Sequence, residues 1–147
     1  MDTCWRSTGT TSHYGLVSLL HGQEVTGADM SRAIYEIDRL GRRMEEFFDD
    51  FDLLLSPTMA VTAFPIGQRP SVIGGREVEP FWGFLPFTYL INITGQTAAS
   101  VPCGYSEDGM PIGLHIIGPR GSEARVLRAS AAFEQAQPWA GVRPEVS

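Results

Sequence analysis

The sequence contains no lysine. All 11 basic residues are arginines, and with 17 aspartates and glutamates they give a formal net charge of -6 at pH 7. A surface that binds nucleic acid or anionic lipid needs clustered positive charge, because both ligands are polyanions. No such basic cluster occurs in this chain. We therefore expect neither nucleic-acid binding nor attachment to a membrane surface.

Long apolar runs and paired cysteines are also missing. The longest apolar stretches, at 53–55 and 89–91, are far shorter than the roughly 20 residues of a membrane-spanning helix. The N-terminus lacks the apolar core of a signal peptide, so we expect a soluble, cytoplasmic protein. Cys4 and Cys103 lie far apart in the sequence, which gives neither a disulfide framework nor a metal-ligand spacing. We expect two reduced thiols, no metal and no cofactor.

Glycine and proline are abundant, at 16 and 10 of 147 residues. This composition argues against an all-helical bundle, and the length suits one domain, or part of one, with a sizeable core. We expect a single partial domain with four segments: a loose N-terminal helix and loop (1–25), a long helix and buried strand (26–56), a loop rich in proline and glycine (57–86), and a strand hairpin with a final helix (87–147).

Two helices are expected in the N-terminal third. Residues 12–23 are compatible with a short helix. Thr26 stands three residues before Asp29 as a variant capping box that starts a long helix. An apolar stripe follows and is expected to face the core. Its members are Met30, Ile34, Ile37, Met44, Phe48 and Phe51.

The remaining chain predicts strands followed by a helix. The apolar run 52–56, ended by Pro57, is typical of a strand covered on both faces in a parallel or mixed sheet. Residues 87–93 form either a helix or a strand, ended by Gly95, and a short strand follows at 100–103. A turn at 107–109 closes a hairpin with a central strand at 112–118. Ser122 is expected to cap a helix that runs to about 137. Together these elements predict an α/β fold.

Cys103 and His115 lie on the two arms of this hairpin, and a thiol with an imidazole is a combination of nucleophile and base. If the turn centres on Asp108, Cys103 opposes Gly113, and His115 is a diagonal neighbour roughly 7 to 8 Å away. That separation is beyond hydrogen-bond reach. The competing interpretation is a small buried thiol and a sheet histidine with a local partner.

The most specific sequence motifs begin at Phe87. They are FTYLINITGQTAASVPCG, then an acidic turn, then GMPIGLHIIGPRGSEARVLRASAAFE. Together with the earlier LGRRMEEFFDDFDLLLSPTMA, it resembles the C-terminal part of amidase-signature hydrolases. Several separated blocks agree in order from about residue 26 to 139. His115 stands where that family usually has glutamine.

The resemblance implies a serine nucleophile, a second serine in a cis peptide and a lysine base, acting on a carboxamide. None of those positions is matched in this chain, which has no lysine. The loop 6–12 lacks the paired glycines of an oxyanion site and is expected to be a frayed terminus. We therefore expect the C-terminal segment of an amidase, with a mixed sheet flanked by helices, that is incomplete and inactive alone.

The resemblance places Phe84, Phe87 and Thr88, which precede a turn at Asn92, near the substrate acyl group. Asn92 and Thr58, the latter at the pocket rim, complete the five candidate substrate-binding residues. The alternatives are core aromatics for the two phenylalanines, a loop-fixing role for Asn92 and a simple turn for Thr58. In the amidase-like subunits of glutamine-dependent tRNA amidotransferases, an acidic residue shortly before the Phe-Thr pair recognises the glutamine amine. The stretch 83–86 carries no carboxylate here, which favours an apolar aryl or aliphatic amide.

Two functions from different classes follow, and a third rests on the thiol. The first is an amidase segment that acts on a small-molecule amide when an N-terminal catalytic segment completes it. The second is a non-enzymatic binding or assembly module. Because the strands 52–56 and 112–118 are apolar on both faces, such a module would self-associate through exposed sheet edges. The third is a thiol hydrolase that uses Cys103.

Overall fold

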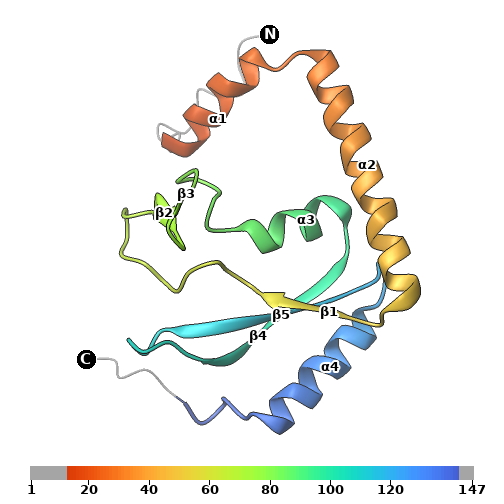
Figure 1. The fold of residues 1–147 in the computed structure, drawn as a ribbon, viewed down its shortest axis with the longest axis vertical. Coiled ribbons are helices and arrows are strands. Elements are labelled where there is room, and N and C mark those ends of the chain that lie inside the picture. The colour runs from red at the N-terminus through yellow and green to blue at the C-terminus, as the bar shows by residue number, and fades with distance from the viewer. Residues whose placement is uncertain (1–12, 143–147) are drawn as a thin grey trace, which may run out of the picture. The chain divides into compact units, whose positions relative to one another are not determined.

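The computed structural model describes residues 13–142 (Figure 1). These residues belong to two compact units, and the division between Glu36 and Ile37 falls within a helix. In chain order the elements are α1 (His13–Glu24), α2 (Gly27–Asp50), β1 (Leu54–Pro57), β2 (Val72–Ile73), β3 (Arg76–Glu77), α3 (Pro86–Thr94), β4 (Thr97–Tyr105), β5 (Pro111–Gly118) and α4 (Glu123–Ala136). None of the helices in this range is both long enough and apolar enough to cross a bilayer.

The first unit contains α1 and the first turns of α2. The predicted capping box is confirmed. The Thr26 amide donates to Asp29 Oδ2 at 2.9 Å, and the Asp29 amide donates to Thr26 Oγ1 at 3.1 Å. These two bonds satisfy amides that the first helical turn leaves without partners. Hydrogen bonding, above all with the Thr26 side chain, lowers the pKa of Asp29.

The apolar stripe of α2 is only partly a core face. Met44 is 8% exposed and Phe48 packs against it, as predicted. Met30 and Ile34 are 56% and 60% exposed, so the prediction is wrong for these positions, and it is also wrong for Ile37 and Phe51. Periodicity identifies the face of a helix, but it does not supply the chain that covers this face.

The second unit is built on a three-stranded antiparallel sheet in the order β1-β5-β4. The predicted central position of β5 is confirmed. β1 is an edge strand of the described sheet, and Leu55 on it is 57% exposed. The expectation that this strand is covered on both faces is therefore wrong within the described residues. Each strand in an antiparallel sheet needs only one buried face.

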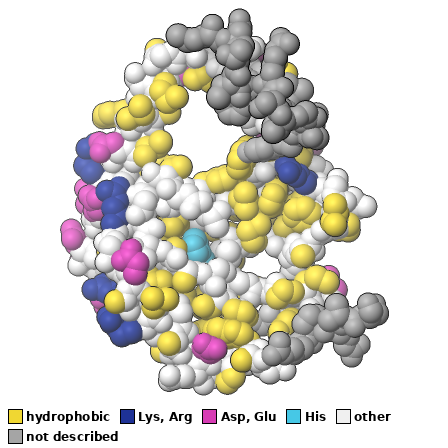
Figure 2. Space-filling model, turned by 180° about the vertical axis from the view of Figure 1, so that it is seen from behind, with side chains coloured by type: hydrophobic (Ala, Val, Ile, Leu, Met, Phe, Trp, Pro, Cys, Tyr) yellow, Lys and Arg dark blue, Asp and Glu magenta, His cyan; other side chains and the backbone are white. Residues whose placement is uncertain are grey.

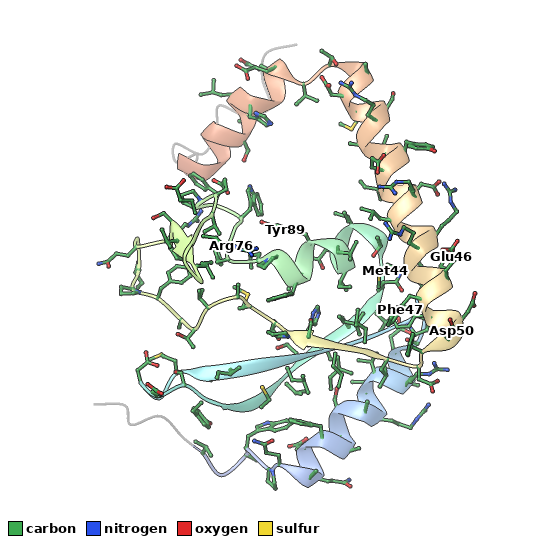
Figure 3. All side chains as sticks on the ribbon, in the orientation of Figure 1. Met44, Glu46, Phe47, Asp50, Arg76 and Tyr89 are labelled. Atoms are coloured by element: carbon green, nitrogen blue, oxygen red, sulfur yellow. The ribbon has the colours of Figure 1, made fainter. Side chains whose placement is uncertain are left out.

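Both faces of β5 carry apolar side chains, because helices lie on opposite sides of the sheet (Figure 1). On one face Ile117 packs with Met44 of α2 and Ile91 of α3, and Met44 lies on the side of α2 that faces α3 (Figure 3). On the other face Ile116 packs with Val101 and with Val126 of α4. The sheet is thus the shared wall of two small cores.

The helices that flank the sheet begin and end where sequence signals stand. Residues 87–93 are helical, as one of the two alternatives predicted. Gly95 ends α3 with a φ of 71°, a left-handed conformation that suits glycine. Ser122 precedes α4, but its hydroxyl donates to the Pro119 carbonyl at 2.6 Å and makes no cap bond. The prediction of a side-chain cap there is wrong, because the turn takes the hydroxyl.

The 57–86 segment is less irregular than expected, because it contains a two-strand hairpin of β2 and β3. Val72 pairs with Glu77, and Ile73 pairs with Arg76. The two residues between the strands, Gly74 and Gly75, both have positive φ, the conformation of the tight hairpin turn that favours glycine. The Gly-Gly pair was the available sequence signal for this hairpin.

The double packing of β5 predicts a large penalty for shortening Ile117, which is 1% exposed. Ile117→Ala should lower the free energy of unfolding by ~2–5 kcal/mol, because the cavity it leaves cannot fully collapse. Ile66→Ala is the matched control, since Ile66 is fully exposed and should change stability by less than ~0.5 kcal/mol. Urea denaturation followed by circular dichroism measures both. Equal losses for the two variants would contradict the assigned core.

Candidate functional site

A hollow of about 630 Å³ opens in the second unit. No charged side chain lines it, and threonine contributes the single polar side chain. Its lining residues are Pro57, Met59, Ala60, Val61, Thr62, Ala63, Phe64, Phe84, Pro111, Ile112 and Gly113. Figure 2 shows a face on which hydrophobic side chains gather with few charged ones between them. An apolar concave site of this size suits the apolar part of a small organic ligand.

Pro57, the last residue of β1, and the residues after it form one side of this hollow, and we call residues 57–64 the wall segment. Two contacts join it to the stretch before α3. The Ala60 amide donates to the Phe84 carbonyl at 3.3 Å, and the rings of Phe64 and Phe84 meet edge to face at 5.2 Å. The wall segment and Phe84 therefore form one continuous apolar surface.

The position of Phe84 depends on a tight turn before it. The Gly83 amide donates to the Glu79 carbonyl at 2.7 Å. A Cβ on Gly83 would stand 2.5 Å from Cβ of Val78, so only glycine fits there. The Tyr89 hydroxyl donates to the Trp82 carbonyl, and Tyr89 projects from the first turn of α3 (Figure 3).

A smaller hollow of about 300 Å³ adjoins the larger one and shares Met59, Pro111, Ile112 and Gly113 with it. Its polar groups are two hydroxyls. Thr58 Oγ1 lies 2.6 Å from Ser100 Oγ, and the Thr58 amide donates to the Gly113 carbonyl at 2.9 Å. The combined site therefore offers apolar surface, the paired hydroxyls of Thr58 and Ser100, and the hydroxyl of Thr62.

Two of the five residues predicted from the sequence lie at these hollows: Phe84 lines the larger one and Thr58 the smaller. The other three are on α3 and line neither. Phe87 is 37% exposed, Asn92 is exposed, and the Thr88 hydroxyl donates to the Leu85 carbonyl at 3.2 Å. Their role toward a substrate stays a prediction.

Sequence reasoning missed most of the wall. The wall segment and residues 111–113 supply most of the lining of the larger hollow. The available signal was a mainly apolar run, residues 57–66, inside a loop rich in proline and glycine. Apolar residues in a long loop have to pack against something or line a site.

Cys103 and His115 do not form a pair. Pro102, not Cys103, opposes Gly113, because a register irregularity leaves Cys103 between the paired residues 102 and 104. The predicted opposition of Cys103 to Gly113 is therefore wrong. The Cys103 thiol donates to the Ile112 carbonyl at 3.4 Å. Cys4 and the 6–12 loop lie outside the described residues.

His115 is a sheet histidine with local neighbours, as the competing interpretation expected. It opposes Ser56 on one side and Ser100 on the other, and its Nδ1 lies 3.5 Å from Ser56 Oγ. The side chain is 6% exposed, and burial lowers the pKa of His115. His115 lines neither hollow.

No group of histidine, cysteine or carboxylate side chains that could hold a metal ion occurs between residues 13 and 142. Neither hollow contains a lysine, a histidine or a carboxylate. The described site can therefore bind and orient a ligand, but it offers no base that would activate a serine or water nucleophile.

The buried histidine makes stability depend on pH. The pKa of His115 lies below its unfolded value of about 6.5, so below that pH the unfolded chain binds a proton that the folded chain does not. The free energy of unfolding should fall as the pH drops through this value and level off below the folded pKa.

His115→Gln removes this contribution, and the difference between the two profiles isolates it from the carboxylates. Urea denaturation from about pH 5 to about pH 8 measures the effect. Profiles that run parallel for His115→Gln and the unmodified chain would refute it.

Comparison with known proteins identifies relatives over most of this chain. The Amidase family model matches residues 7–127. An acylamidase of Rhodococcus erythropolis is 37% identical over 132 residues, which are 88% of this chain and 28% of the relative. One subunit of the glutamyl-tRNA(Gln) amidotransferase of Thermodesulfovibrio yellowstonii is 37% identical over 102 residues, 68% of this chain and 20% of the relative.

Comparison with solved structures identifies the same family. A bacterial aryl acylamidase of the amidase-signature enzymes superimposes with a TM-score of 0.77 at 36% identity, over 88% of this chain and 27% of that structure. The chain thus spans less than a third of the length of these relatives. The predicted α/β fold class and the predicted resemblance to amidase-signature hydrolases are both confirmed. The family match over residues 7–127 shows that this chain belongs to the amidase family.

Proposed function

We propose that this chain is the pocket-forming part of an amidase, one that hydrolyses a carboxamide to a carboxylate and ammonia or an amine. The observation that carries the proposal is the apolar hollow between the wall segment and Phe84, in a chain of the amidase family. In this proposal the chain supplies the sheet and one wall of the acyl pocket.

The catalytic groups come from another segment in this proposal. An amide carbonyl is a poor electrophile, so hydrolysis needs an activated nucleophile and donors for the developing oxyanion. A Ser/cis-Ser/Lys centre cannot be assembled from a sequence without lysine. We propose that an N-terminal catalytic segment of the same family completes the site, and that this chain alone is inactive.

An apolar aryl or aliphatic amide is the proposed substrate. A charged acyl group would lose its hydration in the larger hollow without gaining a partner, because no charged side chain lines it. The stretch 83–86 has no carboxylate for a glutamine amine. Phe84 contacts the apolar group and Thr58 lies at its polar end, while Phe87, Thr88 and Asn92 remain predicted contacts on the α3 side.

A binding or assembly module is the second candidate, favoured by exposed apolar surface at the sheet edge. Leu55 on the edge strand β1 and Phe51 before it are 57% and 55% exposed. An edge strand with exposed leucine is a site for pairing with another chain. In this alternative two copies of the chain associate and no amide is cleaved.

The binding part of the proposal predicts that Phe84→Ala weakens the affinity for 4-nitroacetanilide, an uncharged aryl amide. The expected loss is about tenfold in Kd, because one aromatic wall of the hollow is removed. Phe51→Ala is the matched control, since Phe51 is an exposed phenylalanine away from the hollow, and its Kd should stay unchanged. Isothermal titration measures both, and equal affinities for all three proteins would count against the pocket.

The catalytic part predicts that the chain alone releases no 4-nitroaniline from this compound. The segment of the Rhodococcus erythropolis acylamidase upstream of the matched region is then added. We expect release of 4-nitroaniline from this mixture, because the added segment would supply the nucleophile and the base. Absorbance at the 4-nitroaniline band follows the reaction, and size-exclusion chromatography follows the complex. Hydrolysis by the chain alone would refute the proposed division of roles. A stable homodimer that binds but never cleaves would favour the second candidate.

A further inference from the structure

A hydroxyl pair on the sheet joins the wall segment to a strand far away in the sequence. Thr58 belongs to the wall segment, and Ser100 lies in the middle of β4. Their Oγ1 and Oγ atoms are 2.6 Å apart, a normal O–H···O hydrogen-bond distance. The central strand β5 lies between β1 and β4, so the bond bridges it from one side to the other.

The bridge exists because residue 113 of β5 is a glycine. A Cβ on Gly113 would stand 2.7 Å from Ser100 Oγ and 2.7 Å from Thr58 Oγ1. The hydroxyl pair therefore occupies the space that a side chain would fill. Any side chain at 113 would force the two hydroxyls apart. With glycine at this position, both hydroxyl oxygens can lie close to the backbone of β5.

The hydrogen bond between Thr58 and Ser100 lies at the point where the wall segment leaves the sheet. The Thr58 amide donates to the Gly113 carbonyl, which is the last described backbone bond that ties the wall segment to β5. Beyond Thr58 the wall segment leaves the sheet, and its next described backbone bond runs from Ala60 to Phe84. Thr58 is thus the point at which the wall segment is attached to the sheet, by one backbone bond and one side-chain bond, and the described contacts of the segment beyond Thr58 are with Phe84.

We propose that Ser100 and Gly113 are positioning residues for the ligand pocket. The missing side chain of Gly113 leaves space for the Ser100 hydroxyl, and this hydroxyl forms a hydrogen bond with Thr58. Thr58 in turn orients residues 59–64 along the larger hollow. Neither residue takes part in chemistry. The inference rests on the proposed function only in that the wall segment is taken as the ligand's side of the pocket, and its test needs no ligand.

The test is backbone hydrogen exchange of a peptide that covers residues 57–64, measured by mass spectrometry. Ser100→Ala removes one partner of the bond, and Thr58→Val removes the other while keeping the shape of the side chain. Each should accelerate exchange at the protected amides of this peptide, those of Thr58 and Ala60, by about fivefold, the effect of losing one ordinary hydrogen bond. The double variant should exchange no faster than the single variants, because both lose the same bond.

Rescue and control variants separate positioning from general weakening. Ser100→Thr keeps the hydroxyl and should exchange like the unmodified chain, whereas Gly113→Ala should accelerate exchange although both hydroxyls remain. Ser130→Ala is the matched control. It removes a serine hydroxyl of the same unit that donates to the Val126 carbonyl within α4, and it should leave residues 57–64 unchanged.

Several outcomes would overturn the inference. They are unchanged exchange in Ser100→Ala and Thr58→Val, additive effects in the double variant, or acceleration in Ser100→Thr equal to that in Ser100→Ala. Failure of both Ser100→Ala and Thr58→Val to fold would overturn it too, because the pair would then serve folding and not the wall. Lack of 4-nitroacetanilide binding by the unmodified chain would refute the proposed function without changing these exchange results.

Discussion

The pairing of β5 on both sides is the interaction on which the second unit depends. It joins β1 and β4, which lie far apart in the chain, and it presents Ile117 to one core and Ile116 to the other. A strand with two buried faces and two paired edges leaves no freedom in register, because a slip of one residue would exchange the faces. The wall segment and the hollow inherit their positions from this register.

The hollow depends on small residues as much as on large ones. Gly113 leaves room for the hydroxyl pair, and Gly83 lets the chain pass close to Val78 before it presents Phe84. A ligand pocket needs points at which two chain segments approach each other closely. It also needs apolar side chains that are separated from one another by the space for the ligand. This chain meets both needs with a glycine in a strand, a glycine in a turn, and the mainly apolar run of residues 57–66.

The proposed function assigns ligand binding and amide cleavage to different segments. The residues at the two hollows provide apolar area and hydroxyls, and the whole sequence contains no lysine. His115, an imidazole within the sheet, is buried, its Nδ1 lies 3.5 Å from Ser56 Oγ, and it lines neither hollow. Such a division is physically reasonable, because orientation of an amide requires shape, whereas its cleavage requires a nucleophile and a base.

The sequence by itself determined the elements that depend on local signals. These are the capping box at Thr26, the glycine end of α3, the turn before β5 and the central place of its apolar run. The family followed from separated motifs in order. Tertiary structure alone decided which apolar faces are covered, since Met44 is buried and Met30 is not, although both lie on one helical stripe. It also decided that Cys103 misses its predicted partner by one register step, and that Thr58 meets Ser100 across Gly113. These contacts join positions distant in sequence, and no local pattern encodes their distance.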